Sequence, residues 1–304
     1  MSILCIGQCA YDITFPIHEP LCENQKYRIY DKFECIGAPA ANAAILCAMW
    51  EEESMLISRI GKDFYGKQIL RVLETYGVES TYVIEDKEFS TPVSAIIANS
   101  NNGSRTIFNC PGHQRELNFR YPNRADVILV DGHELQASIE ALQKYPNAVS
   151  VIDAGTYKEE TRTLGALVDH LVCSQDFARQ YTGIQLDDQN QEVWLKAFSL
   201  LHEINEKNIV VTLGESGLLY EKEGEICHLP AYHVKAIDTT GAGDIFHGAY
   251  TYCIQKGYSL EDTLKISSAA SAISVQTLGG QPSIPDKERV NEFLKAHGEG
   301  IRVT

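Results

Sequence analysis

Residues 238–250 read DTTGAGDIFHGAY, and this stretch decides how the chain is interpreted. Two carboxylates, Asp238 and Asp244, flank small residues that let a ligand approach the backbone closely, and glycine tolerates the positive φ of a tight loop. The apolar segment that follows has the length of a helix and ends at Lys256-Gly257. The loop therefore predicts the N-terminus of a buried helix, whose unpaired N–H groups and partial positive charge suit a phosphate.

Asp244 falls in the first turn of this predicted helix, beside the anion site. A carboxylate there can accept the proton of a hydroxyl that attacks the phosphate, and the helix end favours its ionised form. The alternative is a core helix that is simply capped by an Asp. Capping does not account for Gly-Ala-Gly followed by a second Asp, so we favour the catalytic interpretation.

The same stretch resembles, at every defined position, the C-terminal signature of the PfkB/ribokinase family of sugar kinases. In that family the Gly-Ala-Gly backbone forms the anion hole for the transferred phosphoryl group, and the final Asp is the catalytic base. The resemblance assigns the anion hole to Gly241, Ala242 and Gly243 and the base to Asp244. It also implies one kinase domain over residues 1–304, with a ribokinase-like three-layer α/β/α fold, a central mostly parallel sheet and a small β-sheet lid.

Two stretches near the N-terminus match the family's sugar-binding positions. Asp12 occupies the place of the acid that binds sugar hydroxyls, and we expect it just beyond the carboxyl end of the apolar strand 2–6. Residues 37–44, GAPAANAA, resemble the signature Gly-Gly-x-Gly-x-Asn-x-Ala, which gives Gly37 and Asn42 a role in sugar binding. Alanines replace two of its glycines and narrow the backbone freedom of the loop. A turn Asp and a helix-capping Asn are the structural alternatives.

Two further segments predict the lid. Residues 13–36 carry prolines and β-branched or aromatic residues without helical periodicity, which indicates extended edge strands. Residues 91–109 alternate around Asn101-Asn102-Gly103, which predicts a hairpin. In the family such strands, here about 13–36 and 90–110, form a lid over the substrate and often a homodimer contact. The candidate substrate residues on or beside them are Lys26, Arg105 and Asn109.

From about residue 125 the chain alternates continuous apolar strands with helices, which indicates a parallel sheet covered on both faces. Ligands are expected at the carboxyl ends of such strands. His133 lies there as a candidate substrate residue, although a satisfied core histidine is the alternative. Residues 212–217 resemble the family's Thr-x-Gly-x-x-Gly nucleotide turn, and a Ser/Ala-rich helix matches the segment that walls the adenine site. The nucleotide-binding candidates are Ser174, Thr212, Gly214, Gly217 and Ser271.

The metal sites implied by the resemblance are of two kinds. The family usually carries Asn-x-x-Glu near residue 174, linked to magnesium and phosphate, but residues 174–177 read SQDF here. We therefore expect Mg²⁺ to be held mainly by nucleotide oxygens and water. Residues 279–283, GGQPS, resemble the loop that holds K⁺ in ribokinase-like members. By that match the monovalent cation would be held by Asp238, Thr240, Ser274, Thr277, Gly279 and Ser283.

Composition limits the partners. The net charge is −15 with a pI near 5, so neither nucleic acid nor an anionic membrane surface is an expected partner. Nine cysteines are scattered without a Cys-x-x-Cys pair, which argues against disulfides and zinc and favours a reducing cytoplasm. Residues 1–13 predict a first strand and not a secretion signal.

The sequence as a whole therefore predicts an ATP-dependent carbohydrate kinase that binds a sugar and Mg²⁺-ATP, with Asp244 as the base. The segments 246–248 and 109–111, together with Ser174, look like those of keto-sugar members such as fructokinases. A nucleoside kinase, or a kinase of ribose or a sugar acid, is the alternative within the family. A sugar-binding sensor without catalysis is the alternative outside it, although neither the acid nor the anion-hole glycines are lost.

Overall fold

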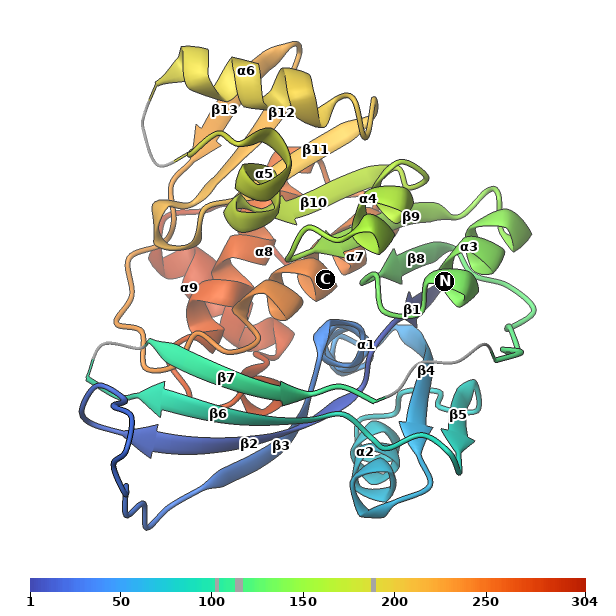
Figure 1. Cartoon of the computed structure of the whole chain (residues 1–304). Helices are drawn as coiled ribbons and strands as arrows, with labels where there is room; N and C mark the ends of the chain where they lie inside the picture. The colour runs from blue at the N-terminus through green and yellow to red at the C-terminus, as the bar shows by residue number, and fades with distance from the viewer. Residues whose placement is uncertain (102–103, 113–116, 187–189) are drawn as a thin grey trace.

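The computed structural model describes residues 1–101, 104–112, 117–186 and 190–304. Within these ranges two sheets are present (Figure 1). The larger has nine strands in the order β13-β12-β11-β10-β9-β8-β1-β4-β5. Its strands are β1 (Ser2–Ile6), β4 (Glu53–Gly61), β5 (Val83–Asp86), β8 (Val127–Val130), β9 (Val149–Ala154), β10 (His170–Ser174), β11 (Asn208–Thr212), β12 (Leu218–Lys222) and β13 (Glu225–Leu229).

The strands from β5 to β11 run parallel, and β12 and β13 complete one edge as an antiparallel hairpin. A parallel sheet is stable when helices bury both its faces, and β1 shows the pattern in its sequence. All five of its residues are buried, and alternate ones pack into different cores, Ile3 on one face and Leu4 on the other. The expectation of a mostly parallel, doubly covered sheet is confirmed.

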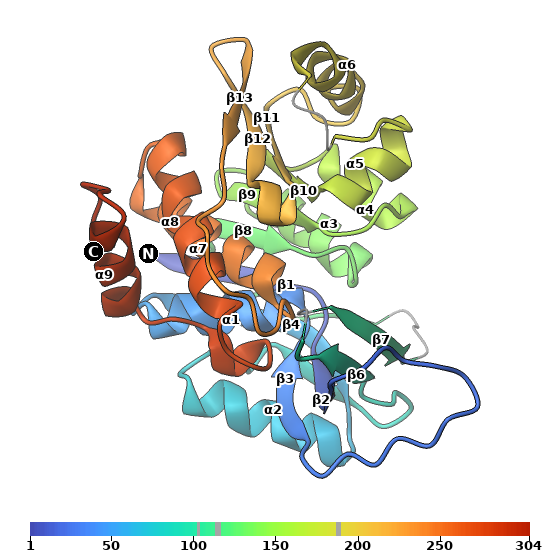
Figure 2. The same ribbon diagram turned by 90° about the vertical axis from the view of Figure 1, so that its left-hand side faces the viewer.

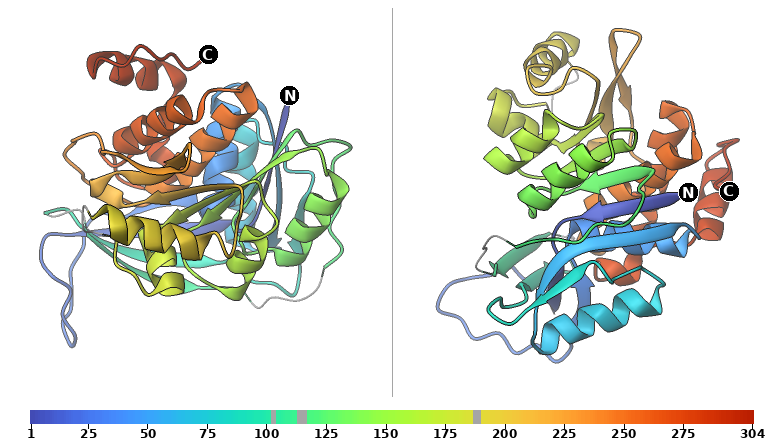
Figure 3. Two further views of the ribbon diagram at one scale, coloured as in Figure 1. Left: turned by 90° about the horizontal axis from the view of Figure 1, so that it is seen from above. Right: turned by 90° about the vertical axis from the view of Figure 1, so that its right-hand side faces the viewer.

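Helices form the two outer layers (Figure 3). Helices α1, α2, α7, α8 and α9 share one hydrophobic core with the sheet, and α3 to α6 share the other. Helix α9 packs outside α8 (Figure 2). The helices are α1 (Pro39–Met49), α2 (Phe64–Thr75), α3 (Leu135–Lys144), α4 (Glu159–Gly165), α5 (Gln175–Thr182), α6 (Gln191–Leu201), α7 (Ala242–Lys256), α8 (Leu260–Ser274) and α9 (Lys287–Ala296).

The smaller sheet has the order β3-β2-β6-β7 and stands apart from the central sheet (Figure 2). Its strands are β2 (Ala10–Ile17), β3 (Phe33–Gly37), β6 (Val93–Asn99) and β7 (Arg105–Cys110). β6 and β7 pair antiparallel, as the hairpin prediction required, and the turn residues 102–103 lie outside the described residues. The expectation of strands throughout 13–36 is wrong in its middle. Residues 18–32 form neither helix nor strand, because no neighbouring strand pairs with this polar stretch.

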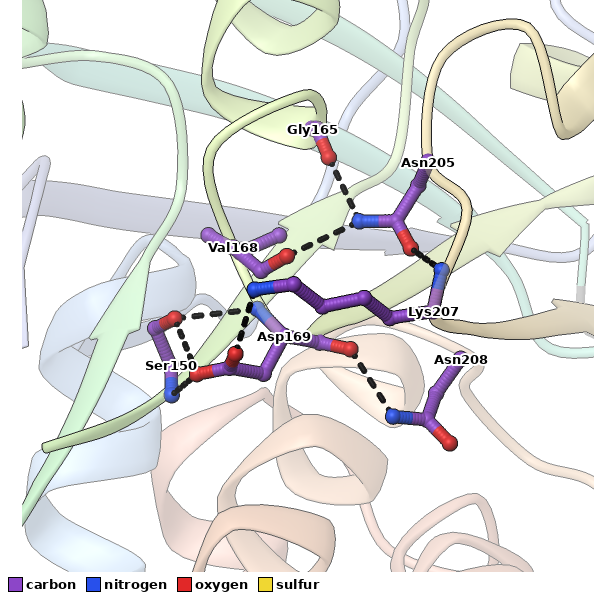
Figure 4. Close-up of polar contacts among 7 residues, drawn as sticks. All are labelled: Ser150, Gly165, Val168, Asp169, Asn205, Lys207 and Asn208. Atoms are coloured by element: carbon purple, nitrogen blue, oxygen red, sulfur yellow. Dashed lines mark hydrogen bonds and ion pairs between the residues drawn. The ribbon is translucent and has the colours of Figure 1, made fainter. Parts of the chain in front are cut away.

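A polar network ties the strand beginnings together at the amino-terminal edge of the central sheet (Figure 4). Asn205 is 2 % exposed, and its Nδ2 donates to the carbonyls of Gly165 at 2.8 Å and Val168 at 2.9 Å. The carboxylate of Asp169 accepts from Ser150 and from Lys207. This edge is fixed by hydrogen bonds and lies opposite the carboxyl ends where ligands are expected.

All nine cysteines are free thiols, and six of them are buried, in agreement with their expected role as small core residues. In the described part of the chain no helix has both the length and the apolar character to cross a membrane.

We expect Asn205→Ala to lower the free energy of unfolding by about 2 kcal/mol, because two buried carbonyls lose their donor. Asn208→Ala is the matched control, since the side chain of Asn208 donates to a single carbonyl, that of Asp169, at 3.0 Å. Urea unfolding of both variants measures the difference. Equal stabilities of the two variants would contradict the role of Asn205.

Candidate active site

The two signature stretches meet at the N-terminus of α7. Asn42, in α1, is 1 % exposed, and its Nδ2 donates to Oδ2 of Asp244 at 2.7 Å. Asn42 lies inside the helix and Ala38 precedes it as the capping residue, so the capping alternative for Asn42 does not hold. Asn42 Oδ1 is buried and has no hydrogen-bond partner among the described residues. Two polar residues distant in sequence are therefore held together at the start of a buried helix.

Glycine at 241 is a requirement of this helix start. Its φ is +76°, and a Cβ there would lie 2.8 Å from the Cα of Gly280, so any side chain would force the two loops apart. A Cβ on Gly243 would instead meet no atom within 4 Å. Ser271 of α8 donates its hydroxyl to the carbonyl of Ala242 at 3.0 Å. The hydrogen bond from Ser271 thus supports the first turn of α7 on the side of α8, while the side at Gly243 is open, as an anion site needs.

Burial and neighbouring acids control the carboxylates here. Burial, together with the negative charge of Asp153 and Asp12, raises the pKa of Asp244 to about 7, although Asn42 and His247 oppose the shift. Burial raises the pKa of Asp12 to about 6, with Asp238 adding to the shift and Ser94 opposing it. A proton acceptor with a pKa near neutrality is suited to general base catalysis.

Asp12 lies in β2 of the smaller sheet, paired with Cys35 and Ser94. The expectation of a loop position just beyond β1 is therefore wrong, because the chain enters a new strand at Ala10 and carries Asp12 with it. A Cβ at Gly37 would lie 2.0 Å from Asp12 Oδ2. Gly37 thus makes room for this carboxylate.

Asp131, at the end of β8, holds the carboxyl edge together. Its carboxylate accepts from the N–H groups of Gln8 at 2.9 Å, His133 at 3.0 Å and Ala40 at 3.3 Å, and it contacts Nδ1 of His133 at 3.1 Å. A cavity of about 450 Å³ opens beside it, next to the smaller sheet. The residues that line it include Gln8, Arg59, Phe89, Asn109, His133 and Lys158.

The other substrate candidates are placed as follows. Arg105, at the start of β7, donates from Nη1 to the hydroxyl of Thr239, so the smaller sheet reaches the loop that precedes α7. Asn109 contacts Ser94 at 3.3 Å and lines the cavity. Lys26 lies exposed within residues 18–32.

The nucleotide candidates lie at neighbouring strand ends. Ser174 accepts from the N–H of Phe177 at 3.0 Å as the cap of α5, and it donates to the carbonyl of Gly155 at 2.7 Å. Thr212 ends β11, where Gly214 and Gly217 have φ values of +61° and +96°. A Cβ at Gly217 would lie 2.1 Å from a carbonyl oxygen of β13, so close packing alone requires glycine at this position.

The cation candidates also come together. The carboxylate of Asp238 accepts from the N–H groups of Thr240 at 2.9 Å and Gly279 at 2.8 Å, which joins the two loops. The hydroxyl of Thr240 is buried and lacks a partner among the described residues. The hydroxyls of Ser274 and Ser283 donate to the carbonyls of Ser271 and Gly280, respectively. The N–H of Thr277 donates to the carbonyl of Ser274. The unpartnered hydroxyl oxygen of Thr240, in the loop anchored by the Asp238 carboxylate, fits a monovalent cation.

Magnesium has a different set of groups available. The hydroxyl of Ser174 is already engaged in the cap, and Asp176 pairs with Arg179 at 2.9 Å. The described residues contain no group of three or more His, Cys, Asp or Glu suited to a metal.

Sequence reasoning passed over two buried residues of the site. Asp153 ends β9, and its carboxylate lies 3.1 Å from Nδ1 of His247 in α7. The position of Asp153 near the carboxyl end of a predicted parallel strand was a signal for a site residue, because ligands bind at such strand ends. Its pairing with His247 depends on the packing of α7 over the sheet, which no local pattern reveals.

Comparison with known proteins agrees with this geometry. Residues 2–287 match the model of the pfkB family carbohydrate kinases. The chain belongs to the pfkB family. Deoxyribokinase of Salmonella typhi is 28 % identical over 270 residues, which is 85 % of this chain and 87 % of that protein.

Solved structures give the same fold. Ribokinase of Thermotoga maritima has a TM-score of 0.80 at 27 % identity, covering 96 % of this chain and 99 % of that one. Ribokinase of Arabidopsis thaliana, complexed with ribose and ATP, has a TM-score of 0.80 at 24 % identity, covering 97 % and 98 %. The pfkB fold expected from the sequence is confirmed, and the protein is a phosphotransferase that acts on an alcohol group.

One pfkB position carries backbone strain in this chain. Ala38 has φ +82° and ψ +150°, a conformation that glycine adopts and other residues rarely do. We expect Ala38→Gly to raise the free energy of unfolding by about 1 kcal/mol, because the relief exceeds the added entropy of the unfolded chain. Thermal or urea unfolding measures the change.

Ala40→Gly is the matched control, since Ala40 lies two residues later in the first turn of α1. Glycine in a helix is less stable than alanine by about 1 kcal/mol, so this variant should be destabilised. A loss of stability in both variants would show that Ala38 is not strained.

Proposed function

We propose that the protein is an ATP-dependent carbohydrate kinase in which Asp244 removes the proton of the attacking sugar hydroxyl. The observation that carries the proposal is the Asn42–Asp244 hydrogen bond of 2.7 Å at the open N-terminus of α7. It joins a residue suited to hydroxyl recognition with a base whose pKa of about 7 lets it gain a proton during the reaction and lose it afterwards.

In this proposal the sugar lies between Asp12, Asn42 and Asp244. A carboxylate can accept from two hydroxyls, which suits a polyol. The γ-phosphate of ATP lies over residues 241–243, where backbone N–H groups and the helix end favour the negative charge that develops in the transition state. These groups position the reactants and stabilise charge, which is most of what phosphoryl transfer asks of a protein.

ATP, Mg²⁺ and K⁺ have separate supports. Thr212, Gly214 and Gly217 lie at the end of β11, beside Ser174 at the end of β10, and this edge is the side proposed for the nucleotide. Ser271 supports the first turn of α7 from α8. Mg²⁺ would supply positive charge to the phosphate oxygens. The unpartnered hydroxyl of Thr240, beside Asp238 and the 279–283 turn, supports a K⁺ site next to residues 241–243, the proposed anion loop.

The smaller sheet is proposed to act as a lid and as the contact of a homodimer. All six residues of its edge strand β7 are exposed, and Ile107 and Phe108 are 47 % and 55 % exposed. Exposed apolar side chains on an unpaired strand edge favour association with another chain.

For the sugar itself we propose a keto-sugar. The segments 109–111 and 246–248, with Ser174, resemble keto-sugar members of the family, and Asn109 and His133 line a cavity able to receive the distal part of the substrate. The relevant measurement is ADP release with ketohexoses, pentoses, sugar acids and nucleosides. We expect the highest kcat/KM with a ketohexose, and preference for ribose or deoxyribose would contradict this assignment.

A nucleoside kinase is the second candidate, because a nucleoside kinase of Methanocaldococcus jannaschii is 25 % identical over 312 residues. Such an enzyme would hold the base against an aromatic ring. Phe89 lines the cavity, but the guanidinium of Arg59 lies 5.3 Å from its ring centroid and occupies that face. This packing favours a sugar over a nucleoside.

We expect Asp244→Asn to lower kcat by about 10²–10⁴-fold, the usual contribution of a general base, while binding of sugar and ATP persists. Initial rates and titration calorimetry separate the two effects. Asp262→Asn is the matched control, because Asp262 also lies in the first turn of a helix, α8. A variant at 244 that keeps most of its turnover would overturn the proposed function.

A further inference from the structure

A buried histidine and a buried acid lie directly beneath the anion loop. His247 and Asp153 are 3 % and 6 % exposed. Nδ1 of His247 lies 2.7 Å from the carbonyl oxygen of Gly243 and 3.1 Å from Oδ2 of Asp153. Nε2 lies 3.1 Å from the carbonyl oxygen of Val172. The ring therefore bridges the first turn of α7, Asp153 of β9 and the middle of β10.

Each ring nitrogen of His247 faces a backbone carbonyl oxygen, which can only accept: Nδ1 faces Gly243 and Nε2 faces Val172. A neutral imidazole has one N–H, so its second nitrogen would oppose a lone pair of a buried oxygen. An imidazolium donates at both positions and satisfies all three contacts. Burial opposes this charge, but Asp153 and the two carbonyls outweigh it and raise the pKa of His247 to about 9.

A second histidine, His170 in β10, packs against the same helix and shows the opposite environment. Nδ1 of His170 lies 2.9 Å from the hydroxyl of Tyr250, which can donate or accept. Burial lowers the pKa of His170 to about 4. Burial alone lowers the pKa of a histidine, so the raised pKa of His247 is due to its acceptors.

We propose that the His247 imidazolium, held by Asp153, is a positioning residue for phosphoryl transfer. It fixes the Gly243 carbonyl in the first turn of α7, which orients the backbone of the anion loop. It also places a positive charge one helical turn from Asp244. The proposal rests on the proposed function, because it takes residues 241–243 as the anion hole and Asp244 as the base.

The charges around the base set the direction of its pH dependence. Asp153 from β9 and Asp12 from β2 raise the pKa of Asp244, and His247 from α7 lowers it. Asp238, from the loop before α7, acts on Asp12. In the wild type kcat/KM should therefore fall as pH drops below about 7, since the base becomes protonated.

The first test reads the proton directly. In the full-length protein labelled with ¹⁵N-histidine, we expect both ring nitrogens of His247 to carry protons from pH 6 to pH 8, while His170 stays neutral. The assignment uses His247→Asn and His170→Asn. A His247 ring that is neutral at pH 7 would overturn the proposal. This outcome does not depend on Asp244, so it is distinct from a failure of the proposed function.

The second test uses kinetics. We expect His247→Asn to lower kcat about 10–100-fold with each KM changed less than about threefold, because orientation of the anion loop is lost. The fall of kcat/KM should move to higher pH, because Asp244 loses a nearby positive charge. His170→Asn is the control, expected to lower the melting temperature and leave kcat and the pH profile unchanged.

A His247 variant that behaves like His170→Asn would show that the pair only stabilises the fold. Asp153→Asn keeps a polar group at the same place and tests the proposal if His247 variants do not fold. We expect the ring of His247 to titrate at lower pH in that variant, and kcat to fall as the ring loses its proton. An unchanged kcat after the ring has become neutral would contradict the positioning role.

Discussion

The contact between Gly241 and Gly280 is the constraint on which the site depends. With φ +76° at Gly241 and only 2.8 Å between a hypothetical Cβ and the facing Cα, two loops meet backbone to backbone. Asn42 lies against both glycines and reaches Asp244 from there. Helix α7 can start at this point only because no side chain intervenes. The positions of the proposed base, the proposed anion loop and the candidate cation loop all follow from that start.

Electrostatics complements this packing. Four carboxylates, those of Asp12, Asp153, Asp238 and Asp244, converge in a protein that is acidic overall. Two are partly neutralised from within, Asp153 by His247 and Asp238 by two backbone N–H groups. The other two face the proposed sugar position with raised pKa values. A ligand that offers hydroxyl protons therefore relieves the repulsion that these acids suffer in its absence.

Much of the fold was predictable because its signals are local. Apolar runs such as Ser2–Ile6, the alternation of 91–109 and the Gly-Ala-Gly loop each indicate their own geometry, and each was located. That Asn42 lies next to the start of α7 was implied by the resemblance and not by any local pattern. The strand position of Asp12, the irregular segment 18–32 and the pairing of Asp153 with His247 were missed. Each depends on which distant segment packs alongside, and that information is absent from neighbouring residues.

The hydrogen bond from Arg105 to Thr239 joins the edge of the smaller sheet to the loop that leads into α7. Arg105 belongs to the smaller sheet and Thr239 to the loop before α7. A tilt of β7 away from the core must therefore either break the bond or pull on that loop. If the smaller sheet acts as the proposed lid, the movement that releases a phosphorylated product is linked through this bond to the backbone proposed to hold the phosphate. Departure of the sugar and relaxation of the proposed anion loop would then occur as one event.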